Sequence, residues 1–279
     1  MTPTAQDKAS RLPTLFIPHG GGPCFFMEWN PPHMWDQMAG YLRGIAGQVG
    51  QTPKTILVIS AHWEEENFTV QATPAPDLYF DYYGFPDHTY DLTYPARGAP
   101  ELAARISALG ADAGIRIDTN HRRGYDHGVF VPLLLIYPEA DIPVLQLSLK
   151  KGYDPEAHIA LGKALKPLRD EGVLIVGSGM SFHDVRALMR AQLGSEPENA
   201  SHHFDVWLTE TVTGKTGEDR NAALNLWAYA PGARIAHPRE DHLIPLMVAA
   251  AAAGDDPAER TYSETLQPVN AALSGFQFG

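Results

Sequence analysis

The chain has 279 residues, of which 44% are hydrophobic and 19% are charged, a composition that suits a folded globular protein with a large core. Acidic residues outnumber basic ones by 33 to 21, so the formal net charge of −12 argues against nucleic acid and anionic membranes as partners. A single cysteine, Cys24, excludes a disulfide within the chain. Because no apolar leader is visible in residues 1–11, we expect a cytoplasmic protein.

Four short apolar segments predict buried strands, since each is bounded by polar residues, glycine or proline. They cover residues 14–17, 55–60, 143–149 and 173–176. Strands that are apolar throughout indicate a sheet covered on both faces.

Helices are predicted between and after these strands. Pro100 suits the first turn of one helix, which Gly110 can end. Asp154 can cap a second helix that begins at Pro155 and stops near Gly172. Further helices are expected at residues 184–193, 199–212, 218–227 and 242–253. The most apolar run, residues 243–253, is too short to span a bilayer.

The alternation of strands and helices predicts an α/β fold with a central, largely parallel or mixed sheet flanked by helices. We see no internal repeat and no linker of low complexity, so residues 1–279 are expected to form one catalytic domain. Residues 1–11 are expected to be flexible.

Three of the predicted strands run directly into a histidine. His19 follows the first, His62 the second, and His183 follows the last through a glycine-rich stretch. A single histidine of this kind is more often a core or capping residue. Since ligand sites of α/β sheets lie at the carboxyl ends of strands, three together favour a shared site at that edge.

Two further histidines come directly after acidic residues. His127 follows Asp126, and His242 follows Asp241. Each pair can be a helix cap, or a carboxylate that orients an imidazole beside a metal. Glycines at Gly20–Gly22, Gly177 and Gly179 permit sharp turns and close backbone approach beside the same histidines.

Ligand type leaves two kinds of metal chemistry open. Histidines with nearby carboxylates suit Fe, Zn or Ni rather than Mg or Ca. Two histidines and a carboxylate favour a non-haem Fe(II) oxygenase, whereas three histidines also suit a hydrolytic zinc. A serine esterase is disfavoured, because the His19-Gly-Gly-Gly22 stretch has no G-x-S-x-G motif to accompany it.

A series of short motifs runs along nearly the whole chain. They are Pro18-His-Gly20, Ser60-Ala-His-Trp63, Tyr83-Gly-Phe-Pro86, Tyr94-Pro-Ala96, Asp126-His-Gly128, Gln146-Leu-Ser148, Gly177-Ser-Gly179 with His183, and Asp241-His242. In this order they resemble the class III (LigB-type) extradiol ring-cleavage dioxygenases, and most closely the branch that acts like a DOPA 4,5-dioxygenase.

The resemblance implies a mononuclear metal site at the strand ends. His19 and His62 match two metal ligands of the family, and His242 matches the third in the DOPA-type branch. A carboxylate ligand at Glu240 or Asp241 stays an alternative, because the wider family uses a glutamate there. Fe(II) is the expected metal, and Zn(II) can occupy the same ligands.

The resemblance also implies a reaction and its catalytic residues. His183 matches the acid–base catalyst, which can additionally reach the metal, and His127 matches a second active-site histidine that contacts substrate or oxygen. The implied reaction opens a catechol ring with O2 beside the two hydroxylated carbons, which gives a muconate-semialdehyde-type product. Asp184 departs from the asparagine that relatives often have after this histidine.

Four residues are candidates for contact with the substrate: Ser60, Trp63, Tyr125 and Arg123, the last of which can meet a substrate carboxylate. The resemblance further implies a homodimer. Two other functions remain open, a zinc-dependent hydrolase that uses the same histidines and a non-enzymatic Memo-like binding protein. The complete histidine set argues against the second.

Overall fold

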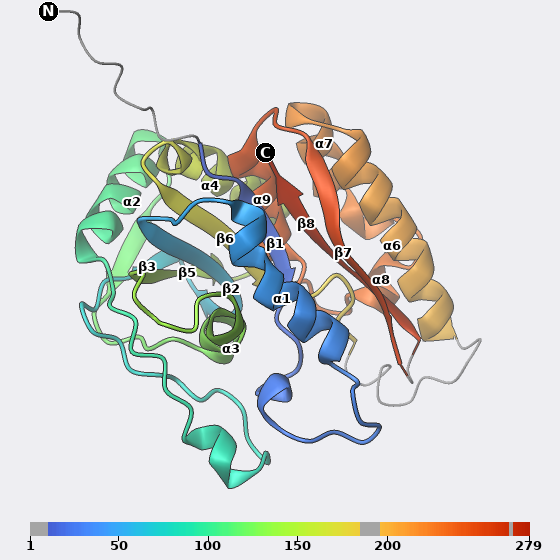
Figure 1. The fold of residues 1–279 in the computed structure, drawn as a ribbon. Coiled ribbons are helices and arrows are strands. Elements are labelled where there is room, and N and C mark those ends of the chain that lie inside the picture. Colours follow the sequence, from blue (N-terminus) through green and yellow to red (C-terminus); the bar gives the residue numbers. More distant parts are fainter. Residues whose placement is uncertain (1–10, 185–195, 268–269) are drawn as a thin grey trace, which may run out of the picture.

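The computed structural model describes residues 11–184, 196–267 and 270–279 (Figure 1). Within these residues a single sheet is built from β1 Thr14–Pro18, β2 Thr55–Glu65, β3 Phe68–Gln71, β4 Ile117–Asn120, β5 Val144–Lys150, β6 Val173–Gly179, β7 Ala258–Leu266 and β8 Ala271–Phe278. The strand order is β4-β3-β5-β2-β6-β1-β8-β7. The expected single α/β domain with a mixed sheet is confirmed.

The centre of the sheet is parallel and consists of the four predicted strands. β5 pairs with β2, β2 with β6, and β6 with β1, all in the parallel sense. Ser178 of β6 lies opposite Ser60 of β2 on one side and Ile17 of β1 on the other. The carboxyl ends of β1, β2 and β6 therefore lie side by side, as the sequence predicted.

The two margins of the sheet were not predicted. At one margin β8 pairs antiparallel with β1 and β7 pairs antiparallel with β8. At the other margin β3 pairs antiparallel with β5 and parallel with β4. These strands widen the sheet without contributing a histidine to its carboxyl edge.

Helices cover both faces of the sheet. Among the described residues they are α1 Asp36–Val49, α2 Pro100–Asp112, α3 His127–Ile136, α4 Pro155–Leu165, α6 Glu196–Gly214, α7 Gly217–Asn225, α8 Ala233–Ala236 and α9 Ile244–Ala253, with short 3-10 turns η1 Cys24–Phe26, η2 Asp87–Tyr90, η3 Lys166–Arg169 and η4 Trp227–Tyr229. No helix in the described ranges has both the length and the apolarity that crossing a membrane requires.

Neighbouring residues of β6 show which helices lie on which face. A Cβ at Gly177 would clash with the carbonyl oxygen of Pro245 in α9, whereas the Ser178 hydroxyl donates to the carbonyl oxygen of Gly128 in α3. Because successive strand residues point to opposite faces, α9 and α3 lie on opposite sides of the sheet. α9 is buried along its whole length and packs between the sheet and α4.

Most predicted helices are confirmed. α2, α6, α7 and α9 match the expected segments within a few residues, whereas α4 ends at Leu165 rather than near Gly172 and is followed by the 3-10 turn η3. Gly110 does not end its helix, because α2 continues to Asp112 and the side chain of Ile117 packs over that glycine. The helix expected at residues 184–193 lies almost wholly outside the described residues. α1 and α3 were not predicted as helices.

Candidate metal centre

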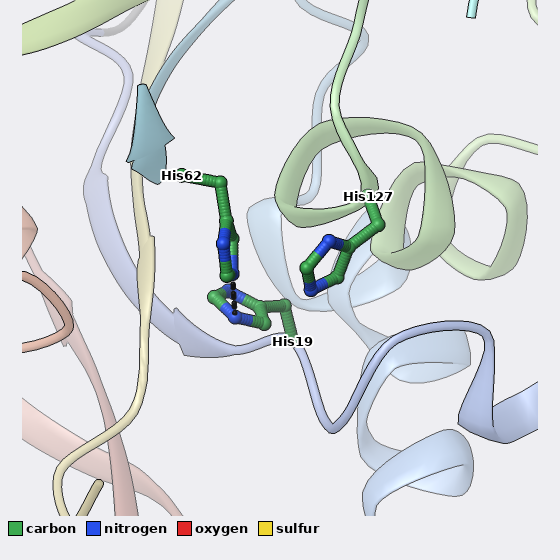
Figure 2. Close-up of side chains that lie close together, drawn as sticks. All are labelled: His19, His62 and His127. Atoms are coloured by element: carbon green, nitrogen blue, oxygen red, sulfur yellow. Dashed lines mark hydrogen bonds between the residues drawn. The ribbon is translucent and has the colours of Figure 1, made fainter. Parts of the chain in front are cut away.

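Two histidines reach the site directly from the sheet. His19 follows β1 and is fully buried, and His62 lies near the end of β2. Their Nε2 atoms are 3.0 Å apart, and Figure 2 shows the two rings turned toward each other. At this separation both nitrogens could bind the same metal ion.

His242 joins the pair from the segment before α9. Its Nε2 lies 3.2 Å from the Nε2 of His62. Glycine permits this approach, because a Cβ at Gly179 would clash with the carbonyl oxygen of His242, which accepts a hydrogen bond from the backbone N–H of Met180. In the structure these glycines of β6 allow close packing against the backbone before and within α9.

His183 and His127 flank this group. The ring of His183 stacks on that of His242, with centroids 3.3 Å apart and an interplanar angle of 13°. His127 is the first residue of α3, and its ring centroid lies 3.9 Å from that of His62 (Figure 2). The structure thus brings together all five histidines that the sequence singled out.

The Nδ1 atoms of His19, His62 and His242 each lie near an oxygen atom. His19 Nδ1 lies 3.0 Å from Ser178 Oγ, which already donates to Gly128 and can therefore only accept from the imidazole. His62 Nδ1 lies 3.6 Å from Asp81 Oδ2. His242 Nδ1 lies 3.0 Å from Asp241 Oδ1, though without hydrogen-bond geometry. A proton on each Nδ1 leaves the Nε2 lone pairs free.

Burial keeps these imidazoles uncharged. Burial first, and then the neighbouring histidines, hold the pKa of His19, His62 and His242 well below the ordinary value. Burial also lowers the pKa of His183 to about 4, against the opposing charge of Asp184. Neutral imidazole is the form that binds metals.

The geometry of the nitrogens fits a metal ion. Imidazole nitrogens bound at right angles to an ion about 2.1 Å away lie about 3.0 Å apart, close to the separations of 3.0 Å and 3.2 Å observed. Two Nε2 lone pairs at this distance repel each other unless a cation lies between them or one of the two nitrogens carries a proton. Ligand atoms within 4.8 Å of one another form two groups, His19 with His62 and His127, and His183 with Asp241 and His242.

Asp81 belongs to the site although the sequence did not indicate it. Its Oδ1 accepts hydrogen bonds from the Nδ1 and the backbone N–H of His127, at 2.8 Å and 3.0 Å. Burial alone would raise the pKa of Asp81, but the hydrogen bonds from His127 favour the ionised carboxylate and bring the pKa below the ordinary value. No motif could have found this residue, because it lies in a long irregular segment between β3 and α2.

The four residues predicted to contact the substrate do not line one exposed surface beside the histidines. Tyr125 is fully buried and its hydroxyl donates to the carbonyl oxygen of Val144 in the core. Trp63 is buried, with its indole N–H bonded to Glu65. Ser60 and Arg123 instead contact Asp126 and the backbone of His62.

Ser60 and Arg123 share the buried carboxylate of Asp126. The Ser60 hydroxyl donates to Asp126 and accepts from the backbone N–H of His62. The Arg123 guanidinium donates to Asp126 and to the carbonyl oxygen of His62, and lies 4.4 Å over the ring of Tyr79. This network fixes the backbone at His62. The guanidinium of Arg123 already has partners within the protein.

Comparison with protein families decides what kind of site this is. The family model for the catalytic LigB subunit of aromatic ring-opening dioxygenase matches residues 13–274. The chain belongs to this family. The resemblance drawn from the motifs is thereby confirmed.

Individual relatives agree with the family. The chain is 45% identical over 205 residues to the 4,5-DOPA dioxygenase extradiol of Beta vulgaris, covering 73% of this chain and 75% of that protein. It is 36% identical to the dioxygenase tasH of Hapsidospora irregularis over 93% of this chain and 84% of that protein. It is 32% identical to the 4,5-DOPA dioxygenase extradiol of Escherichia coli strain K12 over 88% of each chain.

One solved structure is also similar. The crystal structure of an uncharacterized protein from Escherichia coli K12 superposes with a TM-score of 0.77 and 26% identity, covering 96% of this chain and 100% of the other. The chain therefore shares its fold with this protein over nearly its whole length.

Proposed function

We propose that the protein is a non-haem Fe(II)-dependent extradiol dioxygenase that opens the ring of a catechol with O2. One observation carries the proposal: three imidazole Nε2 atoms from three separate segments meet, with neighbouring separations of 3.0 Å and 3.2 Å. Membership of the LigB family and similarity to proteins named 4,5-DOPA dioxygenase support the choice of an aromatic diol. The product would be a muconate-semialdehyde-type acid.

His19, His62 and His242 would hold the metal. The Nε2 of His62 lies close to those of His19 and His242, and each of the three rings has an oxygen near its Nδ1. Fe(II) bound there would supply the electron path between catechol and O2 and lower the pKa of the catechol hydroxyls. Zinc on the same ligands would hold the catechol without this redox chemistry.

His183 would take a proton from a catechol hydroxyl. Its imidazole lies against His242, its side chain is 27% exposed, and its lowered pKa of about 4 keeps it neutral at neutral pH. A neutral imidazole accepts a proton as general base and can return it during ring opening as general acid. The bond that breaks joins one hydroxylated carbon to its neighbour outside the diol, and both oxygen atoms of O2 enter the product.

His127 would contact the substrate or O2. Asp81 holds its Nδ1, and the ring reaches toward His19 and His62 (Figure 2). The other side of this imidazole therefore faces the proposed metal position.

Oxygen consumption tests the proposal. Metal-free protein is loaded anaerobically with Fe(II) or with Zn(II), and a panel of catechols is added with air. We expect O2 uptake and a yellow product with iron and neither with zinc. Failure of every catechol to drive uptake by the iron form would contradict the proposal. Ester hydrolysis by the zinc form would then favour the zinc hydrolase, and inertness of both forms a Memo-like binding protein.

Location and assembly belong to the same proposal. A cytoplasmic location is supported by the single cysteine, Cys24, which is buried and free. A homodimer is implied only by the family resemblance. Analytical ultracentrifugation of the metal-loaded protein would measure directly whether it forms a homodimer.

A further inference from the structure

Asp81 faces two histidines that come from different elements. It lies between β3 and α2, on a segment attached near this point by the hydrogen bond from the Tyr79 N–H to the carbonyl oxygen of Tyr125. Its Oδ1 accepts from His127 Nδ1 at 2.8 Å, and its Oδ2 lies 3.6 Å from His62 Nδ1. The Asp81 side chain is 12% exposed. The carboxylate of Asp81 thus lies near the Nδ1 atoms of both His62 and His127.

The chemistry of the carboxylate decides which ring nitrogens carry protons. An ionised carboxylate can only accept hydrogen bonds, so the nitrogens that face it are favoured as N–H donors. The backbone N–H of His127 adds a second donor to the same Oδ1 at 3.0 Å, which fixes the carboxylate at the start of α3. A neutral ring with its proton on Nδ1 has its lone pair on Nε2.

We propose that Asp81 is a positioning residue that selects the Nδ1–H tautomer of both His62 and His127. His62 would then present its Nε2 lone pair to the metal, and His127 would present its own to substrate or O2. This role rests on the proposed function, since it supposes a metal held by His62. Asp81 itself would touch neither the metal nor the substrate.

The neighbouring carboxylate Asp126 has a different task. It accepts from Ser60, Arg123 and Gln146, so it reaches His62 through the backbone contacts of Ser60 and Arg123. Asp126 therefore sets where the chain at His62 lies, whereas Asp81 faces the ring itself. A change in the tautomer of the His62 ring would therefore indicate the loss of Asp81 rather than of Asp126.

The variant Asp81→Asn keeps the shape of the side chain and changes one hydrogen-bonding group. Its remaining oxygen can still accept from His127, and its new amide NH2 then faces His62 Nδ1–H, donor against donor. We expect His62 to lose the Nδ1–H tautomer. Metal affinity should then fall about 10- to 100-fold, the usual effect of removing the hydrogen-bond partner of a metal-binding histidine. Asp77→Asn, at an exposed carboxylate of the same segment, is the matched control.

Long-range 1H–15N NMR of the zinc-loaded full-length protein reads the tautomers, and competition with a chelator measures zinc affinity. We expect Nδ1–H at His62 and His127 in the unchanged protein, loss of it at His62 in Asp81→Asn, and no effect of Asp77→Asn. In the iron form, kcat should fall in Asp81→Asn while KM changes little.

Two results would overturn the proposal. One is an Nε2–H tautomer of His127 in the unchanged protein, a measurement that does not require the variant to fold. The other is a folded Asp81→Asn with unchanged zinc affinity and unchanged His62 signals. Both readings are independent of O2 uptake, so a failure of the catechol chemistry is recognised separately.

Discussion

Buried histidines occur in two settings in this protein, and they differ in where their nitrogens point. Outside the cluster, His158 of α4 donates from Nδ1 to the carbonyl oxygen of Asp154 and accepts at Nε2 from the backbone N–H of Lys150. His237 donates from Nε2 to the carbonyl oxygen of Ser181. In the cluster, by contrast, His19 uses Nδ1 on Ser178 and turns Nε2 toward another imidazole nitrogen.

Burial alone does not separate the two settings. It holds the pKa of His158 at about 4 and that of His237 at about 3, and it also lowers the pKa of the cluster histidines. What separates them is an Nε2 whose nearest partner is another lone-pair nitrogen. Imidazole nitrogens gathered at this distance suit a cation.

Replacing one of the three proposed ligands, His19, His62 or His242, should therefore weaken metal binding more than it weakens the fold. In His62→Ala we expect metal affinity to fall by more than about 100-fold, since losing a partner behind a ligand already costs about 10- to 100-fold. O2 uptake should be lost with it. Metal content after dialysis and the thermal midpoint of the metal-free protein measure the two effects. A variant that bound metal normally would remove His62 from the ligands.

The stacked pair His183 and His242 offers a finer contrast inside the cluster. His183→Gln should lower kcat by about 100- to 10,000-fold, the usual contribution of a general base, while the protein keeps its metal. Stopped-flow turnover and metal analysis of the same sample separate these roles. Full activity of His183→Gln would exclude its role as the base, and loss of metal would make it a ligand.

The histidine positions were largely predictable because they depend on strand ends. The segments before His19 and His62 are apolar throughout, and such strands end at a common edge in an α/β fold. Asp81 was not predictable in this way. It lies among irregular residues and meets His127 only because its segment crosses the start of α3.

The fold follows the same division between periodic and aperiodic sequence. β7 is buried only at every fourth residue and carries Glu259, Arg260 and Glu264, so it lacks the continuous apolar run that marked the central strands. α3 is apolar on all sides and contains Pro132, so no helical period or polar face is visible. In both cases the neighbouring elements decide the structure.

Ser178 tests whether the Nδ1 partner matters for a ligand in the way that the contrast suggests. Ser178→Ala removes the acceptor of His19 Nδ1–H, and we expect metal affinity to fall about 10-fold. Ser148→Ala is the matched control, because its hydroxyl is equally buried and accepts from the backbone N–H of Thr69 away from the cluster. The control should lose about 1 kcal/mol of unfolding free energy and no metal affinity. Equal metal affinity in both variants would contradict a role for Ser178.

His158 should show the opposite behaviour, an effect on stability that depends on pH with no effect on metal. Its pKa of about 4 in the folded protein lies below the value of about 6.5 expected in the unfolded chain. The unfolded state therefore binds more protons as pH falls from about 6.5 to about 4, and stability falls with it. At about pH 5 the difference amounts to about 2 kcal/mol relative to neutral pH.

The variant His158→Gln isolates this contribution, because a glutamine side chain does not titrate. It should be less stable than the unchanged protein at about pH 7.5, since it loses one of the two backbone hydrogen bonds, each worth about 1 kcal/mol. Between about pH 7.5 and pH 5 this deficit should shrink by about 2 kcal/mol, because only the unchanged protein has the penalty at His158. Urea unfolding of the metal-free forms at both pH values measures the change. A deficit independent of pH would mean that His158 can bind a proton in the folded state, and that its Nε2 does not hold the backbone N–H of Lys150 as the structure shows.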